Sequence, residues 1–136
     1  MIKTIFGILI LSVMAFAGCS ANKDADVKAF MTDVDKITNE ITTKINSNPT
    51  SAGVEEAQKI LDGKKSDLKS RYDKLKELRG YELSEPVMKS FTESVSKNME
   101  SVADLQIKNA EKTITDEVFG KKLNKLYTDY NAIFGV

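Results

Sequence analysis

The residue with the most distinctive chemistry is Cys19, the single cysteine of the 136-residue chain. A thiol can act as a nucleophile, bind a metal, form a disulfide or be modified covalently. The chain has no histidine, so neither a cysteine–histidine nor a serine–histidine–aspartate arrangement can form. One cysteine also excludes an internal disulfide. The sequence therefore gives Cys19 no partner for a catalytic pair or an internal disulfide.

The other titratable residues predict no catalytic or metal site. Because the chain has no histidine, three kinds of site are excluded: a haem site with an axial histidine, a di-iron centre built on Glu-x-x-His pairs, and a zinc site built from cysteine and histidine. Acidic residues lie close together in three places: Asp33 and Asp35, Glu55 and Glu56, and Asp116 and Glu117. None has the spaced loop pattern of a calcium site, and we interpret them as solvated surface residues. We expect a protein that is not an enzyme and needs no cofactor.

The first 18 residues have the three parts of an export signal. Lys3 provides the positive start, residues 5–17 are almost entirely apolar, and small residues surround the end of that stretch. The stretch is shorter than the roughly 20 apolar residues that a transmembrane helix needs. We therefore predict a signal peptide over residues 1–18 rather than a permanent membrane span.

The end of this signal, Phe16-Ala17-Gly18-Cys19, resembles the lipobox of bacterial lipoproteins. That motif runs leucine, then alanine or serine, then glycine or alanine, then an invariant cysteine. Phe16 departs from the usual leucine, and the other three residues match. The resemblance implies that a diacylglyceryl group is attached to Cys19 and that lipoprotein signal peptidase cuts between Gly18 and Cys19.

The residue after the cysteine bears on the destination. In Gram-negative lipoproteins an aspartate there commonly retains the protein in the inner membrane, so by this resemblance Ser20 favours the outer membrane, facing the periplasm. The anchor would be effectively permanent, because processed lipoproteins carry two or three acyl chains. An alternative stays open: Ala15-Phe16-Ala17 is also an A-x-A site for ordinary signal peptidase, which would release a soluble protein.

After residues 19–23, a lipidated N-terminus with a short tether, we predict a single domain over residues 24–136. Apolar residues recur at intervals of three and four, which is typical of helices with one buried face. The first helix is predicted over residues 24–46, with Asp24 or Asp26 as its cap. Turn-forming residues and a proline then end it.

A second helix is predicted over residues 52–79, ending at Gly80. Its apolar residues follow a spacing close to the seven-residue repeat of coiled coils. Gly63 and Lys64 interrupt that spacing, so we expect a weak point or a kink there. Lys64 and Lys65 are interpreted as solvated surface residues, and Asp67 and Arg71 stand four apart in the favourable order for an ion pair.

A third helix is predicted to start after Ser84 as N-cap, with Pro86 in its first turn. The pattern weakens over residues 113–116, where Thr115 or Asp116 could cap a last helix. One face of this last helix is predicted to be core: Phe119, Leu123, Leu126, Tyr130 and Phe134. Tyr127 and Tyr130 have polar tips, and we expect one of them to reach the surface in a contact patch.

Together these segments predict an all-α fold, an antiparallel bundle of three to four helices. In the three-helix alternative the last two segments merge into one helix that bends near residue 113. The 20 basic and 20 acidic residues balance, so we expect no nucleic acid as a partner.

The predicted function is that of a membrane-anchored lipoprotein of the cell envelope. It would act as a non-catalytic helical interaction or accessory module, with the membrane bound through Cys19 and an envelope protein as partner. The alternative is a carrier that holds a small apolar or lipid-like ligand in the bundle core. A bundle fold alone does not choose between them, because bundles host many unrelated functions.

Overall fold

The described part of the chain, residues 21–78 and 82–136 of a computed structural model, is helical and contains no strand. The predicted signal peptide, the cleavage site between Gly18 and Cys19, the lipidation of Cys19 and the sorting residue Ser20 lie outside the described residues. The elements run in the order α1 (Ala21–Ser47), α2 (Ser51–Asp62), α3 (Lys65–Leu75), α4 (Glu85–Lys108), α5 (Ala110–Thr115), α6 (Glu117–Asn131) and the 3₁₀ turn η1 (Ala132–Phe134). None of these helices is both long and apolar enough to cross a membrane.

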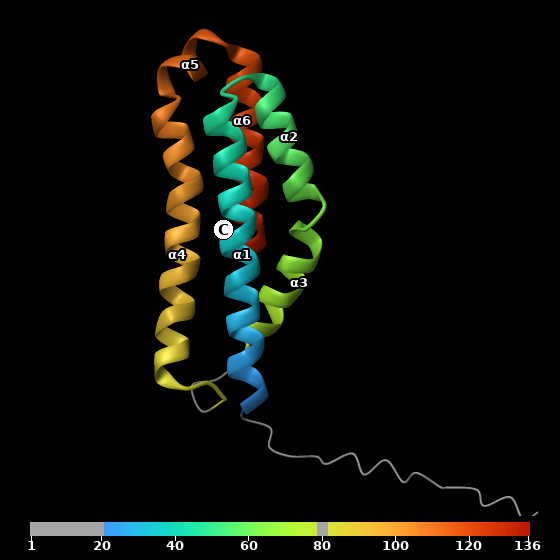
Figure 1. Cartoon of the computed structure of the whole chain (residues 1–136), viewed down its shortest axis with the longest axis vertical. Helices are drawn as coiled ribbons and strands as arrows, with labels where there is room; N and C mark the ends of the chain where they lie inside the picture. Colours follow the sequence, from blue (N-terminus) through green and yellow to red (C-terminus); the bar gives the residue numbers. More distant parts are fainter. Residues whose placement is uncertain (1–20, 79–81) are drawn as a thin grey trace, which may run out of the picture.

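The helices pack side by side into an elongated bundle (Figure 1). From its start at the lower end, α1 rises; α2 and α3 descend; α4 rises again; and after α5 at the upper end α6 descends (Figure 1). The first helix contacts α2, α3 and α4, while α6 contacts α2 and α4. The all-α prediction is confirmed. Six helices replace the expected three to four, because the second segment is broken and α5 joins the last two.

The predicted cap of the first helix is wrong. Because α1 begins at Ala21, residues 21–23 are helical rather than tether, and Asp24 and Asp26 lie inside the helix. The Asp24 carboxylate instead accepts hydrogen bonds from the backbone N–H of Ser84 at 3.1 Å and from its Oγ at 2.7 Å. Both bonds hold the pKa of Asp24 below its usual value. They tie the start of α1 to the start of α4.

The starts of α4 and α6 lie where the sequence predicts them. Ser84 is the residue before α4, but its side chain makes no capping hydrogen bond, because its hydroxyl donates to Asp24. Asp116 does cap α6: its carboxylate accepts from the backbone N–H of Phe119 at 2.9 Å. This cap separates α6 from α5 and excludes the single bent helix of the three-helix alternative. The second helix ends earlier than predicted, at Leu75, and Gly80 lies outside the described residues.

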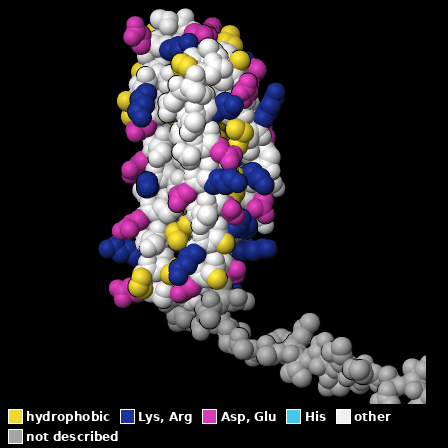
Figure 2. All heavy atoms as spheres, viewed as in Figure 1, with side chains coloured by type: hydrophobic (Ala, Val, Ile, Leu, Met, Phe, Trp, Pro, Cys, Tyr) yellow, Lys and Arg dark blue, Asp and Glu magenta, His cyan; other side chains and the backbone are white. Residues whose placement is uncertain are grey.

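The buried core follows the predicted apolar faces. On α1 it consists of Val27, Phe30, Val34, Ile37, Ile41 and Ile45, and on α6 and η1 of Phe119, Leu123, Leu126, Tyr130, Ile133 and Phe134. In the lower part of the bundle the rings of Phe30, Tyr72, Phe91 and Phe134 form one aromatic cluster. Over the face seen in Figure 2, acidic and basic side chains are interspersed, with small apolar groups between them.

Tyr130 does not reach the surface; it is 1% exposed, whereas Tyr127 is half-buried. The hydroxyl of Tyr130 lies 2.5 Å from Oγ1 of Thr38 on α1, and that Oγ1 also donates to the carbonyl of Val34 at 2.8 Å. Burial of the phenol raises its pKa to about 12. The contact joins α6 to α1.

Alkaline pH should destabilise the protein through Tyr130. Because its pKa is higher in the folded state than in the unfolded state, its contribution is complete below about pH 10 and is lost as pH rises toward about 12. Urea unfolding across this range checks it, with Tyr130→Phe as comparison: the variant should lose about 2 kcal/mol less stability than the wild type over the range. Equal losses in the two proteins would contradict the assignment.

Candidate functional site

The break between α2 and α3 shapes the surface next to α1. Gly63 and Lys64 separate the two helices, as the interrupted apolar spacing predicts. The N–H of Gly63 still donates to the carbonyl of Lys59 at 3.1 Å, but that of Lys64 turns to the carbonyl of Leu61 at 2.9 Å. The chain thus tightens at the break and leaves the α-helical pattern at Gly63 and Lys64. As a result α3 descends along a different line from α2 (Figure 1).

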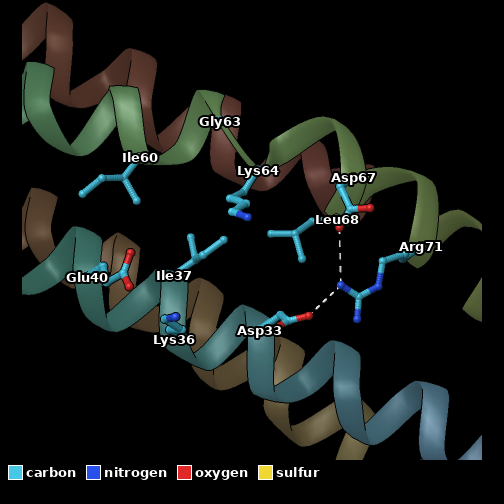
Figure 3. Close-up of a pocket in the computed structure, with 10 residues that line it drawn as sticks. All are labelled: Asp33, Lys36, Ile37, Glu40, Ile60, Gly63, Lys64, Asp67, Leu68 and Arg71. Carbon is cyan, nitrogen blue, oxygen red and sulfur yellow. Dashed lines mark hydrogen bonds and ion pairs between the residues drawn. The ribbon is translucent and has the colours of Figure 1, made fainter.

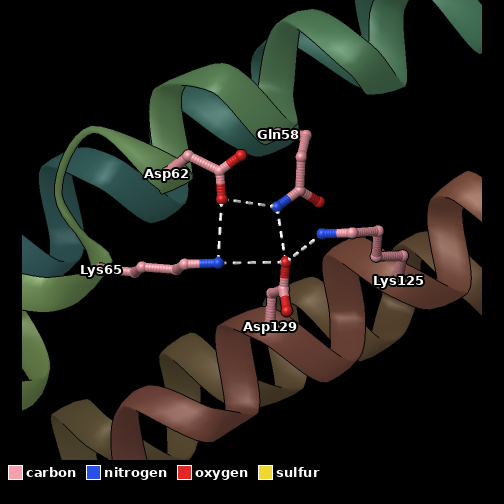
Figure 4. Close-up of polar contacts among 5 residues, drawn as sticks. All are labelled: Gln58, Asp62, Lys65, Lys125 and Asp129. Carbon is pink, nitrogen blue, oxygen red and sulfur yellow. Dashed lines mark hydrogen bonds and ion pairs between the residues drawn. The ribbon is translucent and has the colours of Figure 1, made fainter.

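A cluster of polar side chains fixes the break to α6. We call it the break cluster: Gln58, Asp62, Lys65, Lys125 and Asp129 (Figure 4). The amide of Gln58 donates to Asp129 at 2.7 Å and to Asp62 at 3.0 Å. The ammonium of Lys65 lies 3.0 Å from Asp62 and 3.3 Å from Asp129, which also pairs with Lys125. Lys65 is therefore an internal tie between helices, not the solvated surface residue that the sequence suggests.

The electrostatics of the break cluster favour its charged form. The hydrogen bond from Lys125, followed by that from Lys65, holds the pKa of Asp129 below its usual value. The bond to Asp62 raises the pKa of Lys65 in turn. The hydrogen bonds from Lys65 and Gln58 likewise hold the pKa of Asp62 below its usual value. The break cluster thus keeps the angle between α2 and α3 defined.

Beside the break lies a hollow, the upper hollow, with a volume of about 300 Å³. Its apolar floor is formed by Ile37, Ile60 and Leu68, and charged side chains surround it: Asp33, Lys36, Glu40, Lys64, Asp67 and Arg71. The Lys64 side chain reaches from the break toward the hollow (Figure 3). Three basic and three acidic groups balance at its rim.

Arg71 marks the lower edge of this hollow. Its guanidinium donates to Asp33 of α1 at 2.7 Å and lies 3.4 Å from Asp67 on its own helix (Figure 3). It also lies over the ring of Phe30, 5.6 Å from the centroid. The Asp67–Arg71 pair predicted from spacing is therefore present, but the shorter bond is to α1. Only the fold could reveal that partner, because it lies 38 residues away in sequence.

On the other side of Arg71 lies the lower hollow, with a volume of about 260 Å³. Besides Arg71 it is lined by Lys23, Asp26 and Ala29 of α1 and by Lys74, Leu75 and Leu78. Three basic residues face one acidic residue here, in contrast to the balanced rim of the upper hollow. Together the two hollows form what we call the α1–α3 groove.

The groove has the chemistry of a binding surface. Apolar floors give contact area, and charged rims give orientation and discrimination between ligands. Within the described residues no three acidic or other metal-ligating side chains converge to hold an ion. Nothing in the sequence pointed to the groove except the interruption at Gly63 and Lys64, because its two walls come from segments far apart in the chain.

The predicted modification site, Cys19, stands two residues before the start of α1 in the sequence. Gly18, Cys19 and Ser20 lie outside the described residues, and α1 starts at the residue after Ser20.

Comparison of the chain with models of known protein families, with curated proteins and with solved structures finds no match.

Proposed function

We propose that the protein is a lipoprotein of the bacterial cell envelope, anchored by acyl chains on Cys19, whose helical domain binds another envelope component without catalysis. The anchor rests on the lipobox resemblance of residues 16–19. The binding role rests on one observation, the α1–α3 groove with its apolar floor and charged rim. By the same resemblance, Ser20 favours the outer membrane, facing the periplasm, if the cell is Gram-negative.

The rim of the upper hollow supports a binding role. Lys36, Glu40 and Lys64 line it and make no ion pair with any other residue of the described ranges. A partner with complementary charges could pair with them without breaking an internal salt bridge. Such polar contacts give specificity, while apolar side chains on the floor give affinity. We therefore propose a protein segment with apolar side chains and charges of both signs as the partner.

Replacing Cys19 tests the anchor. In cells fed labelled palmitate, the wild type should incorporate label and fractionate with membranes, and Cys19→Ala should lose the label and leave the signal uncut. The mature N-terminus distinguishes the two processing routes. A modified Cys19 at that end supports the lipoprotein, whereas Gly18 at that end, with no label, would overturn it in favour of a soluble exported protein.

A photo-crosslinking amino acid tests the partner. Placed at Lys64 in the upper hollow, it should give a defined crosslinked protein in intact cells. The matched control is Lys97 on α4, another exposed lysine without an ion pair in the described residues. The same crosslinks from both positions, or none from Lys64, would contradict binding at the groove.

The alternative role, carriage of a small apolar or lipid-like ligand, has one observation in its favour, the apolar floor of the groove. Of the floor residues, Ile37 and Leu68 belong to the buried core and Ile60 is partly buried, so a ligand would lie on the outer side of the core rather than inside it. Native mass spectrometry of the purified protein would show such a ligand in addition to the covalent lipid. Loss of that ligand after Leu68→Gln would place it in the upper hollow.

A further inference from the structure

The lower hollow carries an excess of positive charge that the bundle itself does not neutralise. Lys23 and Lys74 line it, and neither makes an ion pair within the described residues. Arg71 is paired with Asp33 and Asp67, and Asp26 is the one acidic residue in the lining. The two unpaired ammonium groups favour an anionic ligand.

The same hollow offers apolar contact. Ala29 of α1 and Leu75 and Leu78 from the other wall line it beside the lysines. A ligand that combines an anionic group with a short apolar region would match both parts of this lining. A phospholipid has this combination, with an anionic phosphate in its headgroup next to the glycerol and the first carbons of its acyl chains.

The distance along the chain places the lower hollow next to the anchor. Two peptide units, at most about 3.6 Å each, separate Cys19 from the first residue of α1. Lys23 follows two residues into the helix at about 1.5 Å per residue. Measured along the axis of α1, Lys23 thus lies within about 10 Å of Cys19, close to one Debye length at physiological salt.

The upper hollow lies farther from the anchor. Ile37 on its floor is 16 residues into α1, which corresponds to about 24 Å along the helix. Along α1, a membrane surface at Cys19 therefore lies nearer to the lower hollow than to the upper one. Lys64, which lines the upper hollow, is too far along the bundle to meet headgroups beside the anchor.

We propose that the lower hollow binds the phosphate headgroup of an anionic phospholipid in the same leaflet that holds the acyl chains of Cys19, with Lys23 and Lys74 as its ligands. This rests on the proposed lipid anchor, because only an anchored chain keeps the hollow at the membrane. Bound in this way, the bundle is held in one orientation to the membrane, with the upper hollow farther from the membrane surface than the lower hollow.

The test uses the lipid-modified protein extracted in mild detergent and titrated with phosphatidylglycerol, with bound lipid counted by native mass spectrometry. We expect one phosphatidylglycerol per protein in addition to the covalent lipid. Lys23→Gln/Lys74→Gln should weaken this binding about 30-fold, since each lysine near an anionic headgroup contributes about a factor of five. The matched control is Lys28→Gln/Lys89→Gln, which removes the same charge at the same end of the bundle but outside the hollow.

The outcomes separate the inference from the proposed function. Circular dichroism first establishes that both double variants are folded. If phosphatidylglycerol binding is then weakened equally in both, the attraction is diffuse and the hollow is overturned as a site. Displacement of the lipid by inorganic phosphate at similar concentration would also overturn it, because the site would then recognise free phosphate. Palmitate labelling of Cys19 without retained phosphatidylglycerol would reject this inference alone. Absence of the label would reject the anchor.

Discussion

Phe30→Ala should destabilise the protein by about 3–5 kcal/mol, the cost of removing a fully buried phenylalanine from a packed core. Phe30 is 0% exposed. Its ring centroid lies 6.1 Å from that of Tyr72 and 5.9 Å from that of Phe91. Removing it takes the most deeply buried ring from the aromatic cluster and leaves a cavity between α1, α3 and α4. The midpoint of urea unfolding, followed by circular dichroism, measures the loss.

Phe91→Ala is the matched control for this prediction. Phe91 belongs to the same cluster but is only partly buried, so its removal should cost clearly less. Losses of equal size would mean that the deeper burial of Phe30 adds nothing to its contribution to stability. Phe30 also supports the guanidinium of Arg71, so the variant should additionally loosen the lower edge of the upper hollow. Crosslinking from Lys64 would then weaken even in the fraction of protein that stays folded.

Periodicity predicted the core because burial of one helix face depends on local spacing. The residues predicted as the core face of the last helix are all buried: Phe119, Leu123, Leu126, Tyr130 and Phe134. Along α1, six apolar residues at intervals of three and four are buried as well: Val27, Phe30, Val34, Ile37, Ile41 and Ile45. The cap of the last helix was predicted as Thr115 or Asp116; the structure selects Asp116, whose bond to Phe119 spans only three residues. These features need no knowledge of which helix lies next to which.

Contacts between helices could not be read in this way. The bond from Arg71 to Asp33, the bond between Tyr130 and Thr38 and the break cluster all join distant segments. Sequence spacing offered Arg71 a partner on its own helix, and the structure gives it a closer one on α1. The α1–α3 groove was unpredictable for the same reason: its charges converge only after α3 has turned away at the break.

One glycine has a packing role that the sequence did not reveal. Gly53, in the first turn of α2, is buried against the end of the turn after α1. A Cβ built on it would lie 1.9 Å from the carbonyl oxygen of Asn48. That oxygen also accepts the backbone N–H of Thr50 at 2.8 Å, so the turn that joins α1 to α2 needs it in place. The position therefore requires hydrogen in place of a side chain.

Gly53→Ala should accordingly destabilise the protein by about 3 kcal/mol, the upper part of the range for overpacked sites, because backbone rather than a flexible side chain must move. Gly63→Ala is the control. There a Cβ would meet nothing closer than 3.6 Å and φ is −69°, so alanine should stabilise by about 0.4–1 kcal/mol. Thermal and urea unfolding of the two variants compare the same chemical change at two sites. Similar stability of both would show that the α1–α2 turn yields to the methyl group and that Gly53 is not required for the close approach of the two segments.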